Sequence, residues 1–156
     1  MHKVLGMLLM AAALASCGGS AAGGSADGTS DEQPFTIEIV ADDFSFAVPE
    51  VVPAGRVEIS LENIGEQPHQ ALIYRLNNDV AYEDYVAAVL EDDANVPALS
   101  ERLGGVNWGL GTGDSQVDKE SKPYEPGIYA VMCFIRDPDS GKSHLALGMI
   151  SRFTVE

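Results

Sequence analysis

Only a few side chains of this sequence can bind a soft or borderline metal ion, and their order along the chain is distinctive. From residue 35 onward the histidines, the cysteine and the methionines are His69, His144, Cys133, Met132 and Met149. Two imidazoles and a thiolate in a trigonal plane, with a distant thioether, suit copper in both of its oxidation states. The residue types therefore make copper binding the first chemistry to consider.

Two separate stretches carry these residues. His69 ends the segment 62–69, and the remaining candidates lie between Cys133 and Met149. This order resembles that of the cupredoxins, small blue-copper proteins, in which an isolated histidine follows an Asn-containing strand. In that family Cys, His and Met lie together on the loop that joins the last two strands. Pro-Gly-Ile-Tyr at 126–129 also resembles the family's strand entry before the cysteine.

The resemblance covers residues 35–156 and implies a fold, a cofactor and a ligand set. The implied fold class is all-β, a cupredoxin-like Greek-key β-sandwich, here with one helical insertion between strands. The implied cofactor is copper, bound in one mononuclear type 1 site. Its three strong ligands and one weak axial ligand would be His69, Cys133, His144 and Met149.

The interval between the cysteine and the second histidine is longer than in most blue-copper domains, since ten residues separate Cys133 from His144. Asp-Pro-Asp-Ser-Gly at 137–141 has strong turn chemistry and can return the chain to the site. Taken singly, a buried cysteine is commonly a small core residue, and a lone histidine is commonly a hydrogen-bonded structural residue. Met132 should point to the opposite face of its strand from Cys133 and fill the core.

The N-terminal segment has the features of an export signal. Its apolar run over 4–14 is too short to cross a bilayer, which needs about 20 apolar residues. Leu-Ala-Ser-Cys at 14–17 resembles the bacterial lipoprotein signal box, in which cleavage leaves a lipidated cysteine. We therefore predict a signal peptide at 1–16, lipidation of Cys17 and a flexible Gly- and Ser-rich tether within 17–34. A plain secretory signal with an incidental cysteine is the alternative.

Residues 35–156 are predicted to form one domain made mainly of strands. Strand-like patterns occur over 35–39, 44–48, 57–61, 70–76, 128–135 and 150–155. Most of them alternate apolar and polar residues, whereas 128–135 is almost continuously apolar, as in a strand covered on both faces. Six or seven strands separated by Gly and Pro turns favour a sandwich.

The middle of this domain departs from the strand pattern, and we predict a helical and loop insertion at about 78–122. Apolar residues between Tyr82 and Leu90 recur at helical spacing, with Asn78 or Asp79 available to cap the helix and a stop expected near Asp93.

Two further expectations concern the end of this insertion. A short helical turn is expected over 97–103. The Gly-rich segment 104–113 is expected to be a surface loop, because it lacks the sequence and context of a phosphate loop. Trp108 is expected to pack beneath that loop and is given no functional role.

The net charge limits the partners of the chain. Nine Lys and Arg against 24 Asp and Glu leave a formal charge of -15, which repels nucleic acid. No carboxylate pair stands out as acid and base, and a four-ligand site leaves no open position for substrate, so no enzyme is expected. With Cys17 lipidated, Cys133 alone cannot build a dinuclear copper centre bridged by two thiolates.

We therefore predict a monomeric copper lipoprotein of the bacterial cell envelope, anchored to the membrane through Cys17, that transfers single electrons to a protein partner. One alternative is Cu(I) trafficking or resistance with the same ligands, which requires a copper-exchange partner. Another is a metal-free sandwich that acts as an interaction module, with Cys133 simply packed in the core.

Overall fold

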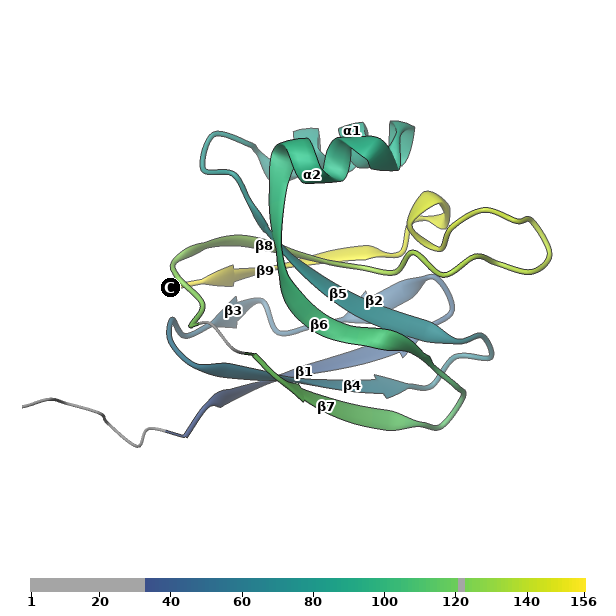
Figure 1. Ribbon diagram of the computed structural model, residues 1–156, viewed down its shortest axis with the longest axis horizontal. Helices are drawn as coiled ribbons and strands as arrows, with labels where there is room; N and C mark the ends of the chain where they lie inside the picture. The colour runs from purple at the N-terminus through teal and green to yellow at the C-terminus, as the bar shows by residue number, and fades with distance from the viewer. Residues whose placement is uncertain (1–32, 121–122) are drawn as a thin grey trace, which may run out of the picture. The chain divides into compact units, whose positions relative to one another are not determined.

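The computed structural model describes residues 33–120 and 123–156, which form two facing β-sheets (Figure 1). The predicted signal peptide, Cys17 and nearly all of the predicted tether lie outside the described residues. Within the described part of the chain, no helix is both long enough and apolar enough to cross a membrane.

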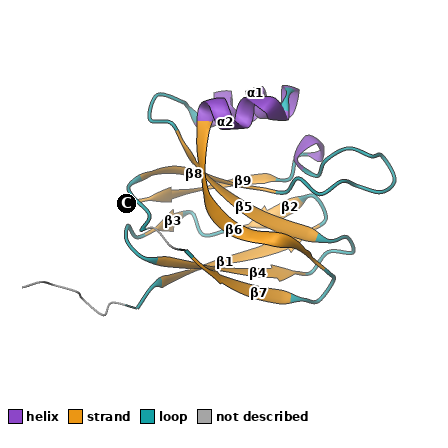
Figure 2. Cartoon of the chain, viewed as in Figure 1, coloured by secondary structure: helices purple, strands orange, loops and turns teal. Residues whose placement is uncertain are grey.

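Each sheet joins strands that are distant in the sequence. The four-stranded sheet has the order β2-β1-β4-β7, with β2 (Ser45–Ala47), β1 (Phe35–Asp42), β4 (Val57–Asn63) and β7 (Ser115–Lys119). The five-stranded sheet has the order β3-β9-β8-β5-β6, with β3 (Val51–Val52), β9 (Ile150–Val155), β8 (Gly127–Met132), β5 (His69–Leu76) and β6 (Ser100–Leu110). The predicted β-sandwich with a helical insertion is confirmed (Figure 2).

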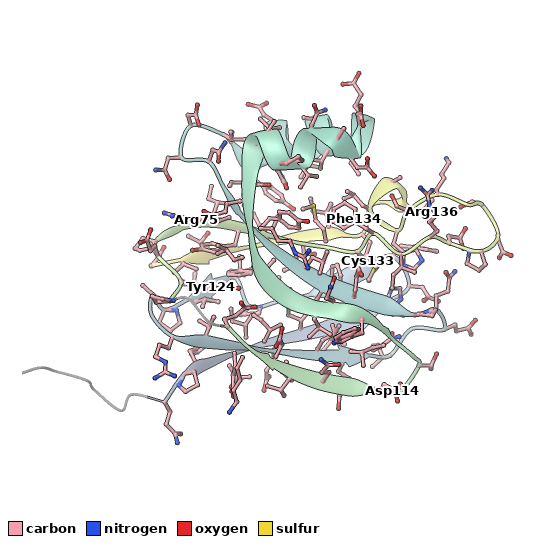
Figure 3. The ribbon with its side chains drawn as sticks, in the orientation of Figure 1. Arg75, Asp114, Tyr124, Cys133, Phe134 and Arg136 are labelled. Carbon is pink, nitrogen blue, oxygen red and sulfur yellow. The ribbon has the colours of Figure 1, made fainter. Side chains whose placement is uncertain are left out.

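The alternation along the strands creates the core between the sheets. In β1 the inward residues Ile37 and Ile39 are fully buried, and β4 contributes its own apolar face to the same core. Three stacked rings, Tyr124, Tyr129 and Phe153, fill this core, with adjacent centroids 5.0 and 5.1 Å apart. Figure 3 shows Tyr124 and Cys133 at different places in the interior.

The helical insertion covers the outer face of the five-stranded sheet. It consists of α1 (Tyr82–Glu91), the 3₁₀ turn η1 (Asp93–Asn95) and α2 (Val96–Leu99), all between β5 and β6. Tyr85 of α1 is fully buried, and its hydroxyl lies 2.9 Å from Ser100 Oγ and donates to Met132 Sδ at 3.7 Å. The prediction that Met132 points to the face opposite Cys133 and fills a core is thereby confirmed, and β8 is apolar throughout because both of its faces are covered.

The start of α1 differs from the prediction. The residue before the helix is Ala81, and no side chain caps it. The main-chain nitrogen of Val80 donates to the oxygen of Asn77 instead, so Asn78 and Asp79 form the turn that precedes the helix. The stop predicted near Asp93 is confirmed, since α1 ends at Glu91.

The prediction of a surface loop over 104–113 is wrong. Most of this segment belongs to β6, which pairs with β5 through an irregular register. Gly105 has a φ of +96°, and a Cβ there would collide with the main-chain oxygen of Ala71. Glycine therefore allows the close approach of two strands here. Trp108 is 68% exposed on β6, so the expectation that it packs beneath a loop is also wrong.

Candidate metal centre

Three neighbouring strands of one sheet place the predicted ligands at the same end of the sandwich. His69 is the first residue of β5, Cys133 directly follows β8, and Met149 directly precedes β9. Since β8 lies between β5 and β9 in the sheet, the ends of these strands are adjacent. His144 precedes the 3₁₀ turn η2 (Leu145–Leu147), which leads into β9.

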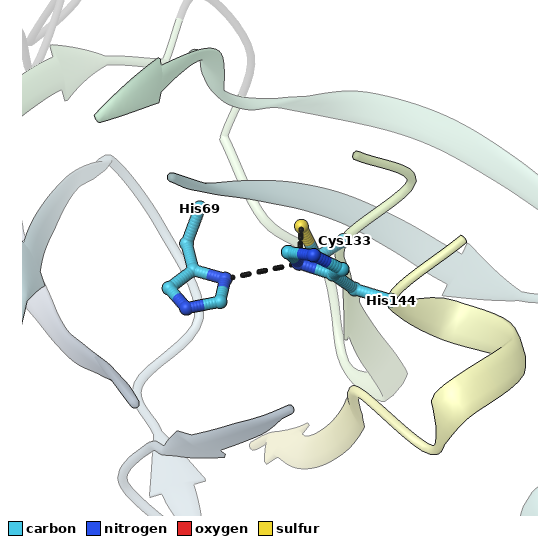
Figure 4. Close-up of side chains that lie close together, drawn as sticks. All are labelled: His69, Cys133 and His144. Atoms are coloured by element: carbon cyan, nitrogen blue, oxygen red, sulfur yellow. Dashed lines mark hydrogen bonds between the residues drawn. The ribbon is translucent and has the colours of Figure 1, made fainter. Parts of the chain in front are cut away.

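Two imidazoles and one thiol meet at this end. Nδ1 of His69 lies 3.2 Å from Nδ1 of His144, and Sγ of Cys133 lies 3.4 Å from the same His144 nitrogen (Figure 4). One ligand atom from each residue lies within 4.8 Å of the other two, and all three residues are fully buried. The structure therefore brings together three of the four predicted ligands.

The fourth predicted ligand, Met149, is tied to the same end of the core through its main chain. Its nitrogen donates to the oxygen of His144 at 2.9 Å, and its oxygen accepts from the nitrogen of Cys133 at 3.4 Å. Its side chain is fully buried in the same core cluster as Cys133. The role of the Met149 thioether as a weak axial ligand stays a prediction.

The long loop between the cysteine and the second histidine closes as a hairpin. The main-chain nitrogen of Asp137 donates to the oxygen of Lys142 at 2.8 Å, and that of His144 donates to the oxygen of Ile135 at 2.7 Å. Leu145 then bonds back to the oxygen of Cys133 at 2.7 Å. These hydrogen bonds return His144 to the thiol despite the ten intervening residues.

The outer nitrogens of both imidazoles are bonded to oxygen atoms. Nε2 of His69 lies 3.1 Å from Oδ1 of Asp43, and Nε2 of His144 lies 3.1 Å from Oε1 of Gln67. The Gln67 amide has this orientation because its own nitrogen donates to Oδ1 of Asp137 at 3.0 Å. Carboxylate and carbonyl oxygens only accept, so both Nε2 atoms donate. In its neutral form each ring therefore presents a lone pair on Nδ1.

Burial determines the protonation of the inner groups. Burial raises the pKa of the Cys133 thiol, and burial together with the neighbouring His69 lowers the pKa of His144. At neutral pH Cys133 is therefore a thiol and His144 is a neutral imidazole. Partial burial raises the pKa of Asp43, but the hydrogen bonds it accepts from Gln67 and His69 outweigh this effect and lower it overall. Asp43 is therefore an ionised acceptor.

The inner donor set suits a soft or borderline cation. The two Nδ1 atoms lie 3.2 Å apart, so neutral rings that carry their proton on Nε2 would both direct a lone pair into the space that a cation can occupy. Cys133 adds a sulfur that becomes anionic when its proton leaves. Imidazole and thiolate ligands suit copper or zinc, whereas calcium and magnesium prefer oxygen ligands.

The turn between β1 and β2 completes the wall of the site. Asp43 in this turn bonds His69, and Phe44 beside it makes an edge contact with the His144 ring, with centroids 5.2 Å apart and planes at 86°. Phe44 adopts a φ of 61°, which is uncommon for a bulky residue. The four-stranded sheet thus contributes to a site whose main residues come from the other sheet.

One buried side chain, Asn63 at the end of β4, fixes the loop before His69. Its Nδ2 donates to the main-chain oxygens of Gln67 and Leu110, both at 2.8 Å, and its Oδ1 accepts from the nitrogen of Gly65 at 2.9 Å. Leu110 is also the β6 partner of His69. Asn63 therefore joins three segments around the first histidine.

Sequence reasoning did not identify the hydrogen-bond partners of the histidines. Gln67 lies two residues before His69, so a search for polar residues beside each ligand would have found it. Asp137 was noted only for its turn chemistry. Asp43 lies in a turn of the other sheet, and no spacing rule connects it to His69 before the fold is known.

Comparison of the sequence with protein-family models gives no match, and comparison with curated proteins gives none either. Similar solved structures include reduced auracyanin from the photosynthetic bacterium Roseiflexus castenholzii, with 20% identity, a TM-score of 0.47, and coverage of 78% of this chain and 96% of that one. Another is rusticyanin from Thiobacillus ferrooxidans, with 17% identity, a TM-score of 0.47, and coverage of 80% and 79%. A further rusticyanin structure among the similar ones is that of a copper protein. The similarity concerns the fold, and the chemistry of the site is inferred from this chain's own side chains.

Removing the Asn63 side chain should destabilise the fold and loosen the loop before His69. We expect Asn63→Ala to lower the free energy of unfolding by about 3 kcal/mol, since the three hydrogen bonds of this fully buried side chain contribute about 1 kcal/mol each. Denaturant unfolding measures this loss. Asn77→Ala is the matched control, because its exposed side chain makes one hydrogen bond, to Ala98. Equal losses in the two variants would contradict the assigned role of Asn63.

Proposed function

We propose that the chain binds one copper ion through His69, Cys133 and His144, with Met149 as the weak axial ligand, and that it transfers single electrons. The observation that carries this proposal is the convergence of two Nδ1 atoms and one Sγ atom in a fully buried cluster, with both Nε2 atoms bonded outward. Two imidazoles and a thiolate with a distant thioether are the donor set of electron-transfer copper sites.

The surroundings of the site support a carrier rather than an enzyme. The three candidate ligands have no exposed surface, so a substrate has no direct access to a bound ion. Their orientation is fixed by strands and by hydrogen bonds to neighbouring side chains, which keeps rearrangement small when the charge of a bound ion changes. When bound, copper supplies the one-electron couple. The electrons would be exchanged with a redox partner protein.

Copper trafficking with the same ligands is the alternative function. A trafficking protein passes the ion intact to an apoprotein, which requires ready exchange of ligands. The buried, multiply bonded histidines favour a retained ion and therefore the electron carrier. A reversible one-electron couple with fast self-exchange would support the carrier, and copper transfer to an apoprotein would support trafficking.

Copper binding by the full chain should produce an intense visible absorption that depends on Cys133, because thiolate ligation to Cu(II) gives strong colour. Cu(II) is added to the chain, and absorption spectra are recorded beside those of Cys133→Ser. Met132→Leu is the control, since Met132 is adjacent in sequence but packs in the other core cluster, and it should keep the colour. A colourless native chain that binds copper no more tightly than Cys133→Ser would refute the proposal.

Copper binding should also release the proton of Cys133. Because burial raises the pKa of this thiol, the thiolate forms at neutral pH only when the metal displaces the proton. We expect about one more proton released per copper by the native chain than by Cys133→Ser at neutral pH, and weaker binding as the pH falls. Titration calorimetry in buffers of different ionisation enthalpy measures the difference. Equal proton release by the two chains would argue against a thiolate ligand.

The cell-envelope location remains part of the proposal, supported by the signal-like N-terminus and the Leu-Ala-Ser-Cys sequence at 14–17. Lipidation of Cys17 would hold an acidic domain near the membrane surface by a tether. Expression in a bacterium with a labelled fatty acid should label the native chain and leave Cys17→Ser unlabelled. Absence of label from the native chain would remove the anchor from the account.

A further inference from the structure

We propose that Gln67 is a positioning residue that connects the outer hydrogen bonds of both histidines, and that the long loop between Cys133 and His144 holds it in place through Asp137. We call the Gln67–Asp137 pair the latch. This inference deepens the proposed function and rests on it, because the two imidazoles are taken as metal ligands.

The contacts of Gln67 reach both imidazoles. Its side-chain oxygen accepts from Nε2 of His144 at 3.1 Å. Its main-chain nitrogen donates to Oδ1 of Asp43 at 3.1 Å, and the same carboxylate oxygen bonds Nε2 of His69. Its main-chain oxygen is fixed by Asn63. One residue therefore constrains the outer edges of the two rings whose inner nitrogens face each other.

Asp137 determines the orientation of the Gln67 amide. Its Oδ1 accepts from Nε2 of Gln67, and its Oδ2 accepts from the main-chain nitrogen of Ser140 at 2.7 Å. Hydrogen bonds from the Ser140 side chain and main chain, followed by that from Gln67, lower the pKa of Asp137 to about 2, so this carboxylate only accepts. A flipped amide would place oxygen against oxygen at Asp137 and N–H against N–H at His144. The loop between Cys133 and His144 thus permits only one orientation of the Gln67 amide.

The ten-residue loop supplies Asp137 in a defined place. The carboxylate sits at the base of the hairpin, where its main chain bonds Lys142 and Gly141, each at 2.8 Å. Asp137 is 6% exposed, although its neighbours in the loop are exposed. The extra length of the loop is explained if its task is to bring a fixed acceptor to the Gln67 amide.

The latch covers the outer edge of His144. The ring is fully buried, and half-buried Gln67 occupies the hydrogen-bonding position at Nε2. Rotation of His144 away from a bound ion would break this hydrogen bond and disturb the amide's bond to Asp137. The latch should therefore keep the Nδ1 atom of His144 unprotonated and directed inward, and should slow the loss of a bound ion.

Four variants of the full chain test the latch. Gln67→Met keeps the length of the side chain and removes both hydrogen bonds, and Asp137→Ala removes the acceptor. Asp137→Asn is an intermediate variant, because its single carbonyl oxygen can accept from Gln67 only if its NH₂ group turns toward the main-chain nitrogen of Ser140. Asp139→Asn is the control, since it removes an exposed charge from the same loop.

The first measurement uses the metal-free chain. Nitrogen-15 NMR of the His144 ring should show a proton on Nε2 in the native chain and in Asp139→Asn, and Asp137→Asn should depart from this less than Asp137→Ala does. Gln67→Met and Asp137→Ala should show a mixture of tautomers. The second measurement is the rate at which the copper-loaded chain loses its metal to a chelator, which should rise about 10- to 100-fold in those two variants, the range in which residues that orient metal ligands commonly act.

The outcomes separate the latch from the copper site. An unchanged tautomer and an unchanged release rate in Gln67→Met would overturn the proposal. Changes in Gln67→Met that are absent in Asp137→Ala would overturn the role of the loop. If the chain bound no copper, the proposed function would fail, and the tautomer measurement on the metal-free chain would still decide whether the latch exists.

Discussion

The site depends on the close approach of two imidazole Nδ1 atoms, which are held 3.2 Å apart in a buried place beside a thiol. Such an arrangement is unfavourable without a proton or a cation to share, so the surrounding structure must enforce it. The groups that hold the two rings in this orientation lie outside the cluster. Asp43 and Gln67 accept from the outer nitrogens and turn both inner nitrogens toward the thiol.

The order of the strands in the sandwich also holds the three residues together. Because β8 lies between β5 and β9, the residues that begin or follow these strands lie next to one another although they are distant in the sequence. The alternation of side chains along β8 directs Met132 to the helices and Cys133 to the space between the sheets. The helical insertion therefore covers one face of the sheet while the other face carries the cluster.

Much of this could be predicted from the sequence. Alternation of apolar and polar residues predicts most of the strands, and helical spacing predicts α1, because these signals are local. The cluster of His69, Cys133 and His144 could be predicted because these residue types are rare in the chain. The glycines of β6 argue against a strand, because glycine usually weakens one. In this strand the absence of a Cβ at Gly105 allows close contact with the main chain of Ala71. Asp43 and Asp137 could not be placed, since their partners are fixed only by packing between distant segments.

X-ray absorption at the copper edge of the copper-loaded chain identifies the atoms that bind the metal. One short sulfur ligand and two imidazole nitrogens are expected around the copper, and the short sulfur should be lost in Cys133→Ser. A native shell of nitrogen and oxygen ligands alone, with no short sulfur, would contradict the account.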